Sequence, residues 1–252
     1  MTIDTPAQLE ALQRIGTIVA NTVQEMARHL EPGITTLEVD QIGDRYLEEH
    51  GALSAPRSVY KFPGATCISV NCEVAHGIPG PRELASGDVV NIDVSASLDG
   101  YYGDTGASFP VGEASEEVLS LCAAGKAACR AGVRAVKTKR RLARLGRAME
   151  QEARRHGYRV IRDLTGHGIG RSLHEEPKNV RSYYDPSDTR RLTEGMVFTV
   201  EPMLSRTADA SRQMPDGWTL ETVDRSLVVQ YEHTLVATKR GAIVLTKPGK
   251  LS

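Results

Sequence analysis

Residues 89–105, VVNIDVSASLDGYYGDT, are the stretch that decides the fold. The first part of this stretch is apolar and rich in β-branched side chains, which favour extended backbone. Leu98, Asp99 and Gly100 then supply turn residues, and residues 101–105 resume an extended pattern. Two strands separated by such a turn predict an antiparallel β-hairpin.

The hairpin brings two carboxylates together. If the turn is centred between Leu98 and Asp99, Asp93 lies directly opposite Asp104 on one face of the sheet. Directly opposed like charges destabilise a sheet, so this pairing favours a cation between them. The alternative is that one carboxylate belongs to the turn while the other is a solvated strand residue. The hairpin alone does not decide between these interpretations.

Three further polar residues stand in strand-like settings bounded by turns. His167 lies among three glycines, where the backbone can approach a ligand closely. A phosphate cradle is the competing interpretation, but the spacing is not that of a nucleotide-binding loop and no lysine follows in the right place. Glu201 ends the apolar run 196–200, and Glu232 lies inside a ten-residue strand pattern over 227–236. A carboxylate in an apolar run is costly to bury unless a hydrogen-bond donor or an opposite charge lies beside it.

Together, Asp93, Asp104, His167, Glu201 and Glu232 are the inventory of a two-metal hydrolytic site. Each residue alone is more often a satisfied polar residue of the core than a ligand. Carboxylates and imidazole suit divalent ions such as Mn²⁺, Fe²⁺, Co²⁺ or Zn²⁺. Two such ions held close together can activate one water.

Four helices are expected around these strands. Thr5 caps the first, with proline at the first helical position and glutamine three residues after the cap. Thr35 begins the second, and two more are expected over residues 116–136 and 141–156. A helix pair followed by strands therefore occurs twice along the chain.

Length and composition agree with one catalytic domain over residues 1–252, since no linker divides the chain. The 31 basic and 32 acidic residues give no overall nucleic-acid footprint. There is no long apolar run and no signal-peptide core, so we expect a cytoplasmic protein without a membrane contact. The 4 cysteines lack metal-type spacing and are predicted to be reduced thiols.

A set of short motifs follows in one order from about Ala65 to Val244. They are AHGIP at 75–79, NIDV at 91–94, GDT at 103–105, GHGIG at 166–170 with HEEP at 174–177, FTVEPM at 198–203 and QYEHT at 230–234. With these motifs the chain resembles the type I methionine aminopeptidases of the pita-bread family. The resemblance implies an α+β fold, in which a pseudo-twofold, curved antiparallel sheet carries helices on its outer face.

The resemblance also implies an activity and a ligand set. The activity is removal of the initiator methionine from nascent polypeptides, favouring a small second residue, through a hydroxide that bridges two divalent ions. Cobalt, manganese, iron and zinc are the candidate metals. Asp93, Asp104 and Glu232 would hold one ion, and Asp104, His167, Glu201 and Glu232 would reach toward the other.

Three residues take catalytic roles by the same resemblance. Glu201 would ligate and also carry the proton from the attacking hydroxide to the leaving amine. His174 would hydrogen-bond the scissile peptide as charge develops on its carbonyl oxygen. His76 would contact the scissile amide nitrogen. Taken alone, each histidine is more often structural than catalytic.

The substrate pocket departs from the family pattern. Phe62, Cys67 and Trp218 keep its aromatic and sulfur-containing character, which suits a methionine thioether. However, Pro56 and Val59 stand where cysteine and tyrosine are expected, and Leu173 stands where phenylalanine is expected. These replacements predict a wider, less aromatic pocket that tolerates leucine or norleucine better than the typical member does.

Other functions remain as alternatives. A non-catalytic pita-bread protein could bind a partner through the same cavity, but such relatives lose metal ligands. Xaa-Pro peptidases usually carry an additional N-terminal domain, for which this chain has no room. The type II methionine enzyme has a long insertion that is absent between Glu201 and Glu232.

A basic segment suggests a partner. Residues 130–159 contain eleven Lys and Arg residues against only Glu150 and Glu152. Such a segment could attract ribosomal RNA near the exit tunnel, where nascent chains emerge. A solvated helical face is the simpler interpretation. The protein itself is expected to be a monomer.

Overall fold

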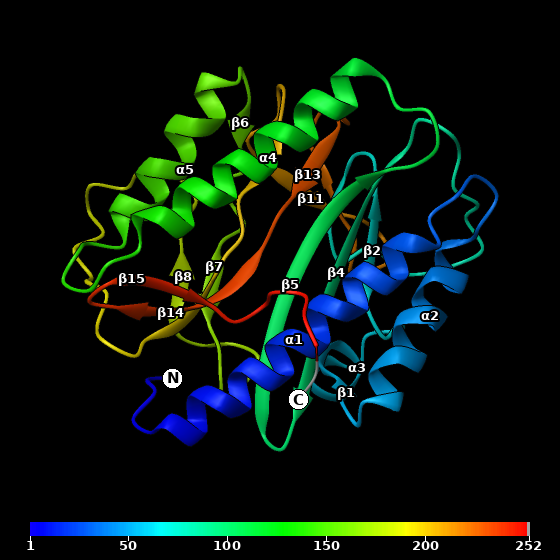
Figure 1. Cartoon of the computed structure of the whole chain (residues 1–252). Coiled ribbons are helices and arrows are strands. Elements are labelled where there is room, and N and C mark those ends of the chain that lie inside the picture. Colours follow the sequence, from blue (N-terminus) through cyan, green and yellow to red (C-terminus); the bar gives the residue numbers. More distant parts are fainter. Residues whose placement is uncertain (251–252) are drawn as a thin grey trace.

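The structure, a computed structural model, describes residues 1–250 and has five helices in this part of the chain (Figure 1). They are α1 (Pro6–Arg28), α2 (Thr36–Glu49), the short α3 (Ala55–Tyr60), α4 (Glu116–Ala135) and α5 (Ala143–Arg155). The four predicted helices are confirmed. Both α1 and α2 begin with a capping box, in which Thr5 pairs with Gln8 and Thr35 pairs with Glu38. These local signals determine where the two helices begin.

Antiparallel strands form four sheets within the described residues. The first contains β1 (Leu53–Ser54), β4 (Val89–Leu98), β2 (Cys67–Val70) and β5 (Tyr101–Pro110). The second contains β15 (Gly241–Val244), β14 (His233–Thr238), β9 (Val197–Val200), β7 (Gly166–Gly168) and β8 (Glu175–Val180). The two smaller sheets are β13 (Val228–Gln230) with β10 (Met203–Ser205) and β6 (Arg159–Val160), and β11 (Ser211–Gln213) with β12 (Leu220–Thr222) and β3 (Glu73–Ala75).

The helices lie on the outside of these sheets. In Figure 1, α1 and α2 (blue) lie beside the β4–β5 hairpin, while α4 and α5 (green) cover strands of the second half. The first packing layer includes Ile15 and Met26 against Ile92, and the second includes Met149 against Phe198. All five side chains are at most 1% exposed, so each helix pair closes its own apolar core. The predicted α+β arrangement is confirmed.

The β4–β5 hairpin is present, but its predicted register is wrong by two residues. Leu98 pairs with Tyr101, so the turn consists of Asp99 and Gly100 rather than being centred before Asp99. Their φ angles are 52° and 75°. Two consecutive positive φ values define a type I′ turn, for which Asp-Gly is a preferred pair. The turn chemistry therefore sets the register.

The corrected register keeps the two carboxylates on one face. Asp93 lies opposite Gly106, and Asp104 lies opposite Ser95. A shift of two residues conserves the face because strand side chains alternate with a period of two. Asp93 and Asp104 are therefore diagonal neighbours instead of direct partners, and both line the same cavity.

A seam of hydrogen bonds joins β5 to the second half of the molecule. The N–H of Glu232 donates to the Gly106 carbonyl at 2.8 Å, and the Thr105 hydroxyl donates to the Glu232 carbonyl at 2.7 Å. The N–H of Asp104 donates to Thr234 Oγ1 at 3.2 Å, while the Thr234 hydroxyl donates to the Asp104 carbonyl at 2.7 Å. These hydrogen bonds hold Asp104 from the first half close to Glu232 from the second half, and both are candidate ligands.

The predicted strand over 227–236 is interrupted at Glu232. β13 ends at Gln230 and belongs to a three-stranded sheet, whereas β14 begins at His233 and belongs to the five-stranded sheet. Glu232 lies where the backbone passes from one sheet to the other. The uninterrupted strand was a wrong prediction, because the apolar pattern does not show which sheet each part joins.

Two expectations about the class of protein can be compared with the structure. Among the helices of residues 1–250, none combines the length and the apolar content that crossing a bilayer requires. The four cysteines, Cys67, Cys72, Cys122 and Cys129, are free thiols, and all four are buried.

Candidate metal centre and active site

A cavity of about 340 Å³ opens between the two halves. Its lining includes all five predicted ligands and both predicted catalytic histidines, namely Asp93, Asp104, His167, Glu201, Glu232, His76 and His174. The ligands come from β4, β5, β7, the end of β9 and the break before β14. Residues spread over about 140 positions of the chain therefore meet in one place.

The metal-ligand atoms lie close together. One ligand atom each from Asp104, His167 and Glu232 can be chosen so that all lie within 4.8 Å of one another. The Nε2 atom of His167 is 3.6 Å from Asp104 Oδ2 and 3.8 Å from Glu201 Oε1. The Gln230 amide donates to Asp93 Oδ2 at 3.4 Å and to Glu232 Oε2 at 3.2 Å. This amide links the Asp93 carboxylate to the rest of the cluster.

A hydrogen bond determines which nitrogen of the neutral His167 ring carries the hydrogen. Its Nδ1 atom lies 3.0 Å from the carbonyl oxygen of Gly168, which can only accept. In the neutral ring the hydrogen is therefore on Nδ1, and Nε2 is the nitrogen that faces Asp104 and Glu201. A metal-binding histidine commonly donates its other ring nitrogen to a backbone carbonyl in this way.

Two buried oxygens show that the cluster fits a cation. Asp104 Oδ1 and Glu232 Oε1 have no hydrogen-bond partner within the described residues. A buried carboxylate oxygen without a donor is costly unless a positive charge offsets it. Neither lysine nor arginine lines this cavity in the described part of the chain. Carboxylate oxygens with one imidazole nitrogen are a donor set that divalent metal ions accept.

Burial changes the protonation of all four carboxyl groups. It is the main cause that raises the pKa of Asp104 and of Glu201 to about 7. Burial, followed by the charge of Asp104, also raises the pKa of Asp93 and of Glu232 well above the usual range. Without a cation, the cluster therefore holds protons at neutral pH. A bound cation would displace them.

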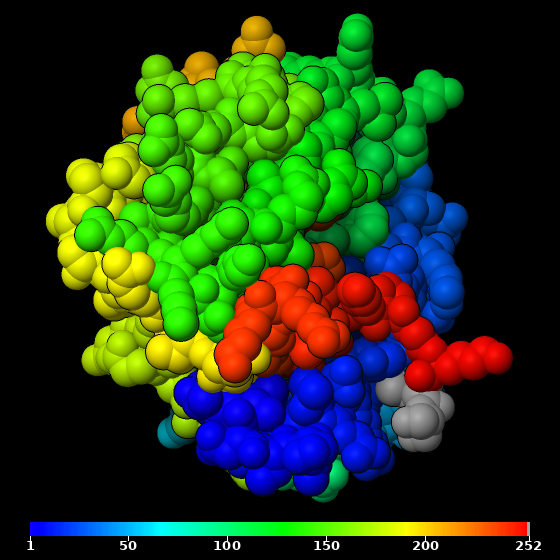
Figure 2. Space-filling model, turned by 60° about the vertical axis from the view of Figure 1, so that its left-hand side comes forward, coloured from blue at the N-terminus to red at the C-terminus, as the bar shows by residue number. Residues whose placement is uncertain are grey.

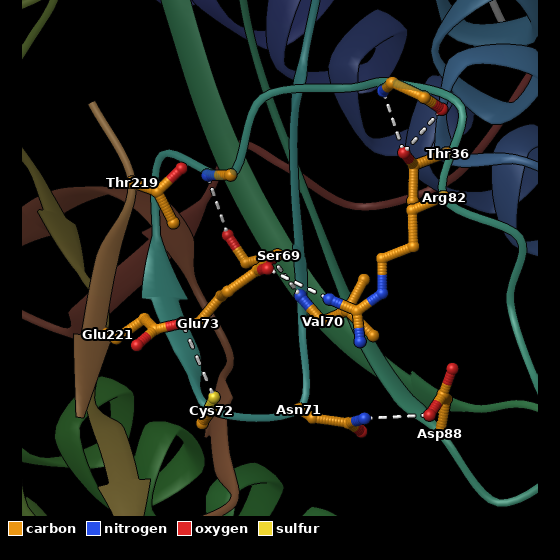
Figure 3. A network of polar contacts seen from close by, with 12 residues as sticks. Thr36, Ser69, Val70, Asn71, Cys72, Glu73, Arg82, Asp88, Thr219 and Glu221 are labelled. Atoms are coloured by element: carbon orange, nitrogen blue, oxygen red, sulfur yellow. Dashed lines mark hydrogen bonds and ion pairs between the residues drawn. The ribbon is translucent and has the colours of Figure 1, made fainter. Parts of the chain in front are cut away.

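His76 is held in place by contacts of the segment that connects β2 and β3. It follows β3 with a φ of 56°, a left-handed conformation that is uncommon for a residue other than glycine. The N–H of Gly77 donates to Ser69 Oγ at 3.1 Å, and the N–H of Val70 donates to the Glu73 carboxylate at 2.7 Å (Figure 3). Arg82 pairs with the same carboxylate at 3.0 Å. This network fixes the backbone that presents His76 to the cavity.

His174 lies beside the candidate metal ligands. Its ring centroid is 3.9 Å from that of His167. Burial first, and then the nearby His167 and His76, lower the pKa of His174 to about 4, so the ring is neutral at neutral pH. The following residue, Glu175, accepts from the N–H of Arg171 at 2.8 Å and pairs with the Met1 ammonium group at 2.9 Å. These contacts hold the loop that carries His174.

The apolar part of the cavity only partly matches the predicted pocket. Pro56, Phe62, Cys67, Leu173 and Trp218 line it, and the Phe62 and Trp218 rings meet edge to face with centroids 5.2 Å apart.

The prediction that Val59 lines the pocket is wrong. Val59 lies outside the cavity lining, whereas Tyr60, although 45% exposed, is part of it. These residues belong to α3, and residues four apart on a helix share a face. Pro56 and Tyr60 therefore face the cavity together, and Val59 turns away. The Tyr60 ring therefore gives the pocket an aromatic wall that was not predicted from the sequence.

Neither Tyr60 nor Gln230 was assigned a role from the sequence, although both contact predicted site residues. Tyr60 lines the cavity and its hydroxyl contacts His174. Gln230 bonds two candidate ligands and stands two positions before Glu232, a spacing that in extended chain places both side chains on one face. That spacing was a usable signal for Gln230. Nothing local in the sequence signals the contact of Tyr60.

Comparison with known proteins places these motifs in one family. Residues 10–239 match metallopeptidase family M24. Methionine aminopeptidase 2 of Bacillus subtilis (strain 168) is 49% identical over 248 residues, covering 98% of this chain and 100% of the relative. The crystal structure of methionine aminopeptidase from Rickettsia prowazekii has a TM-score of 0.94 at 37% identity, covering 98% and 100% of the two chains. Prolidase from Pyrococcus furiosus has a TM-score of 0.78 at 23% identity, and this chain covers 66% of that one.

The carboxyl cluster predicts a specific pH dependence of stability. The folded pKa of Asp104 and Glu201, about 7, lies above their ordinary values of 3.8 and 4.5. The folded state therefore binds more protons than the unfolded state, so these groups lower the free energy of unfolding as pH rises from about 4 through about 7. In urea titrations with a chelator, we expect Asp104→Asn to be more stable than wild type at pH 8, with a smaller difference at pH 5.

Metal addition provides the control for this prediction. At pH 8, Mn²⁺ should stabilise the wild-type protein by mass action and should stabilise Asp104→Asn much less. Equal Mn²⁺ effects on both proteins, or a difference in stability that does not change with pH, would contradict the cation-binding role of the cluster.

Proposed function

Since this chain belongs to metallopeptidase family M24, we propose that it is the hydrolase that removes the N-terminal methionine from new polypeptides, favouring a small second residue. The similarities confirm the resemblance and the pita-bread fold that the sequence predicted. One observation carries the proposed reaction. The complete ligand set, both histidines and an apolar pocket line a single cavity. Hydrolysis of a peptide next to an apolar N-terminal side chain needs these three parts together.

The cofactor in this proposal is a pair of divalent ions, with cobalt, manganese, iron and zinc as candidates. Asp93, Asp104 and Glu232 would hold one, and Asp104, His167, Glu201 and Glu232 would hold the other. When bound, the ions supply the Lewis acidity that activates water at neutral pH. Metal analysis of protein isolated without added ions identifies which metal is used.

Protein groups guide the proton and the peptide. Glu201, which lines the cavity, would accept the proton of the attacking water and pass it to the leaving amine as the C–N bond breaks. The Thr199 hydroxyl donates to Glu201 Oε1 at 2.7 Å and orients this carboxyl group. Neutral His174 donates a hydrogen bond to the carbonyl oxygen as negative charge develops. His76, at the same cavity, contacts the amide nitrogen.

The alternatives fit the site less well. A non-catalytic binding protein needs no ligand set, whereas here all five ligands line the cavity and two buried carboxylate oxygens lack donors. The likeness to an Xaa-Pro peptidase, at 23% identity, concerns the fold alone. Both halves contribute ligands, which supports one catalytic domain over residues 1–252. We further propose a monomer in the cytoplasm, where new polypeptides begin, and the four free thiols agree with this location.

Peptide hydrolysis tests the proposed reaction. With Co²⁺ or Mn²⁺, we expect the protein to cleave Met-Ala-Ser and to leave Xaa-Pro dipeptides intact. Asp104→Asn and Glu232→Gln should each abolish turnover while the protein stays folded, because each removes a charge shared by both proposed ions. His174→Ala should lose about 10²-fold in rate with its metal content unchanged, the scale of one lost transition-state donor.

Three results would contradict this assignment. Near-normal turnover of both carboxylate variants in excess metal would exclude the shared ligands. Loss of metal from His174→Ala would make that residue a ligand. Cleavage of Xaa-Pro dipeptides in preference to Met-Ala-Ser would favour the proline-directed reaction.

The pocket predicts a moderate preference for methionine. Leu173 replaces one expected aromatic wall, while Tyr60, Phe62 and Trp218 retain others. One methylene in an apolar pocket changes kcat/KM by about 10-fold to 200-fold. We therefore expect Met to exceed Leu by less than about 10³-fold in one peptide series, with norleucine between them.

Two substitutions test this prediction against each other. Leu173→Phe should increase the ratio of kcat/KM for Met over Leu, because the side chain faces the pocket. Val59→Tyr restores the residue type that the family pattern expects, but it faces solvent and should leave the ratio unchanged. An equal effect of both variants would show that the assigned walls are wrong.

We also propose that the basic segment docks the protein on ribosomal RNA. All eleven Lys and Arg side chains of residues 130–159 are exposed. Arg154, Arg155 and Arg159 pair with acidic neighbours, whereas residues 137–144, from the connection into the first turn of α5, make no salt bridge within residues 1–250. Figure 2 shows α4, α5 and their connection (green) on one continuous face. Unpaired positive charge on an exposed face favours a polyanion.

Ribosome binding at increasing salt tests this surface. Affinity should fall steeply with salt, and reversing the charges of Arg140, Arg141 and Arg144 should weaken it strongly. The matched control reverses Arg154 and Arg155, whose charges are already paired, and should have a smaller effect. Salt-independent binding, or no binding at low salt, would favour a solvated helical face.

A further inference from the structure

Tyr60 and His174 are joined by a hydrogen bond across the cavity. The Tyr60 hydroxyl oxygen is 2.7 Å from His174 Nδ1, although the residues are 114 positions apart. Their rings meet edge to face, with centroids 5.7 Å apart. On its other side the His174 ring lies over His167, with centroids 3.9 Å apart. His174 is therefore held between a candidate metal ligand and a phenol.

The position of Tyr60 is determined by α3. It is the last residue of this helix, and Lys61 follows with a φ of 59°, which ends the helix at that point. Ser54 caps the other end and also donates its hydroxyl to the Ala65 carbonyl at 2.7 Å. This short helix is capped at both ends, and its last residue points the phenol toward the His174 ring.

The chemistry of the two groups sets the direction of the bond. A phenol hydroxyl is the more acidic donor, and an unprotonated imidazole nitrogen is the better acceptor. Burial, and then the charge of Asp104, raise the pKa of Tyr60, which keeps its hydroxyl protonated. The hydroxyl therefore donates to His174 Nδ1.

We propose that Tyr60 is a positioning residue that fixes the tautomer of His174, so that Nε2 carries the ring hydrogen. This inference rests on the proposed function for its catalytic consequence. Nε2 is the nitrogen that remains for the substrate, and only the tautomer with hydrogen on Nε2 can donate there. Without the phenol, part of the population would carry the hydrogen on Nδ1 and present an acceptor to the developing negative charge. Tyr60 would thus act through His174 and not touch the scissile bond.

Tyr60→Phe tests the proposal, because it removes one oxygen and keeps the ring. We expect kcat to fall by about fivefold to tenfold, the scale of one net hydrogen bond, with KM changing less than about twofold. Tyr46→Phe is the matched control, since Tyr46 stacks on His50 outside the cavity with centroids 4.2 Å apart. It should leave kcat and KM unchanged. In the background of His174→Ala, Tyr60→Phe should cause no further loss.

Nitrogen-15 NMR of the metal-free protein provides a readout that does not depend on activity. At neutral pH, wild-type His174 should show an unprotonated Nδ1 and a protonated Nε2, and Tyr60→Phe should shift both signals toward a tautomer mixture. A proton on Nδ1 in the wild type, unchanged signals in the variant, or a raised KM with normal kcat would overturn the positioning role. If His174→Ala retains full activity while the NMR shift is seen, the catalytic role of His174 fails but the tautomer assignment stands.

Discussion

Four carboxyl groups line one cavity, and the stability of the fold depends on how their charges are balanced. The cavity lining offers no lysine or arginine within the described residues, and two carboxylate oxygens have no hydrogen-bond donor. Burial raises the pKa of each group, and neighbouring carboxylates raise it further for Asp93, Glu201 and Glu232, so the site holds either protons or cations. Proton and metal binding are therefore alternatives at the same atoms. Because of this competition, we expect a site that suits hydrolysis to destabilise the metal-free protein at high pH.

The fold supports these charges from outside the cluster. Thr105 and Thr234 tie β5 to the segment around Glu232, so ligands of both halves move as one unit. Gln230, Thr199 and the Gly168 carbonyl each orient one or two ligand side chains. Each of these partners engages a ligand through a neutral group and adds no net charge. The geometry is thus fixed before a cation arrives, which lowers the cost of assembling the site.

Local signals in the sequence predicted the parts of the structure that depend on local chemistry. The capping boxes at Thr5 and Thr35 gave the helix starts, and the strand composition of 89–105 gave the hairpin. The register failed because the turn centre was placed one residue early, although Asp-Gly favours a type I′ turn. The break at Glu232 could not be predicted, because the strands on either side of it join two different sheets and the apolar pattern does not show this. The contact between Tyr60 and His174 joins segments 114 residues apart and has no local signal.

The errors had different consequences because helices and strands have different periods. The register error in the β4–β5 hairpin was even, so Asp93 and Asp104 stayed on one face and the ligand set survived it. In α3, replacing position 60 by position 59 rotates the side chain by about 100° and removes it from the cavity lining. Ligands on strands are therefore predicted robustly from short motifs, whereas the pocket wall on a helix requires the structure. The candidate metal ligands lie on strands or directly beside them, whereas four side chains of the pocket, Tyr60, Phe62, Leu173 and Trp218, stand on a short helix and on loops.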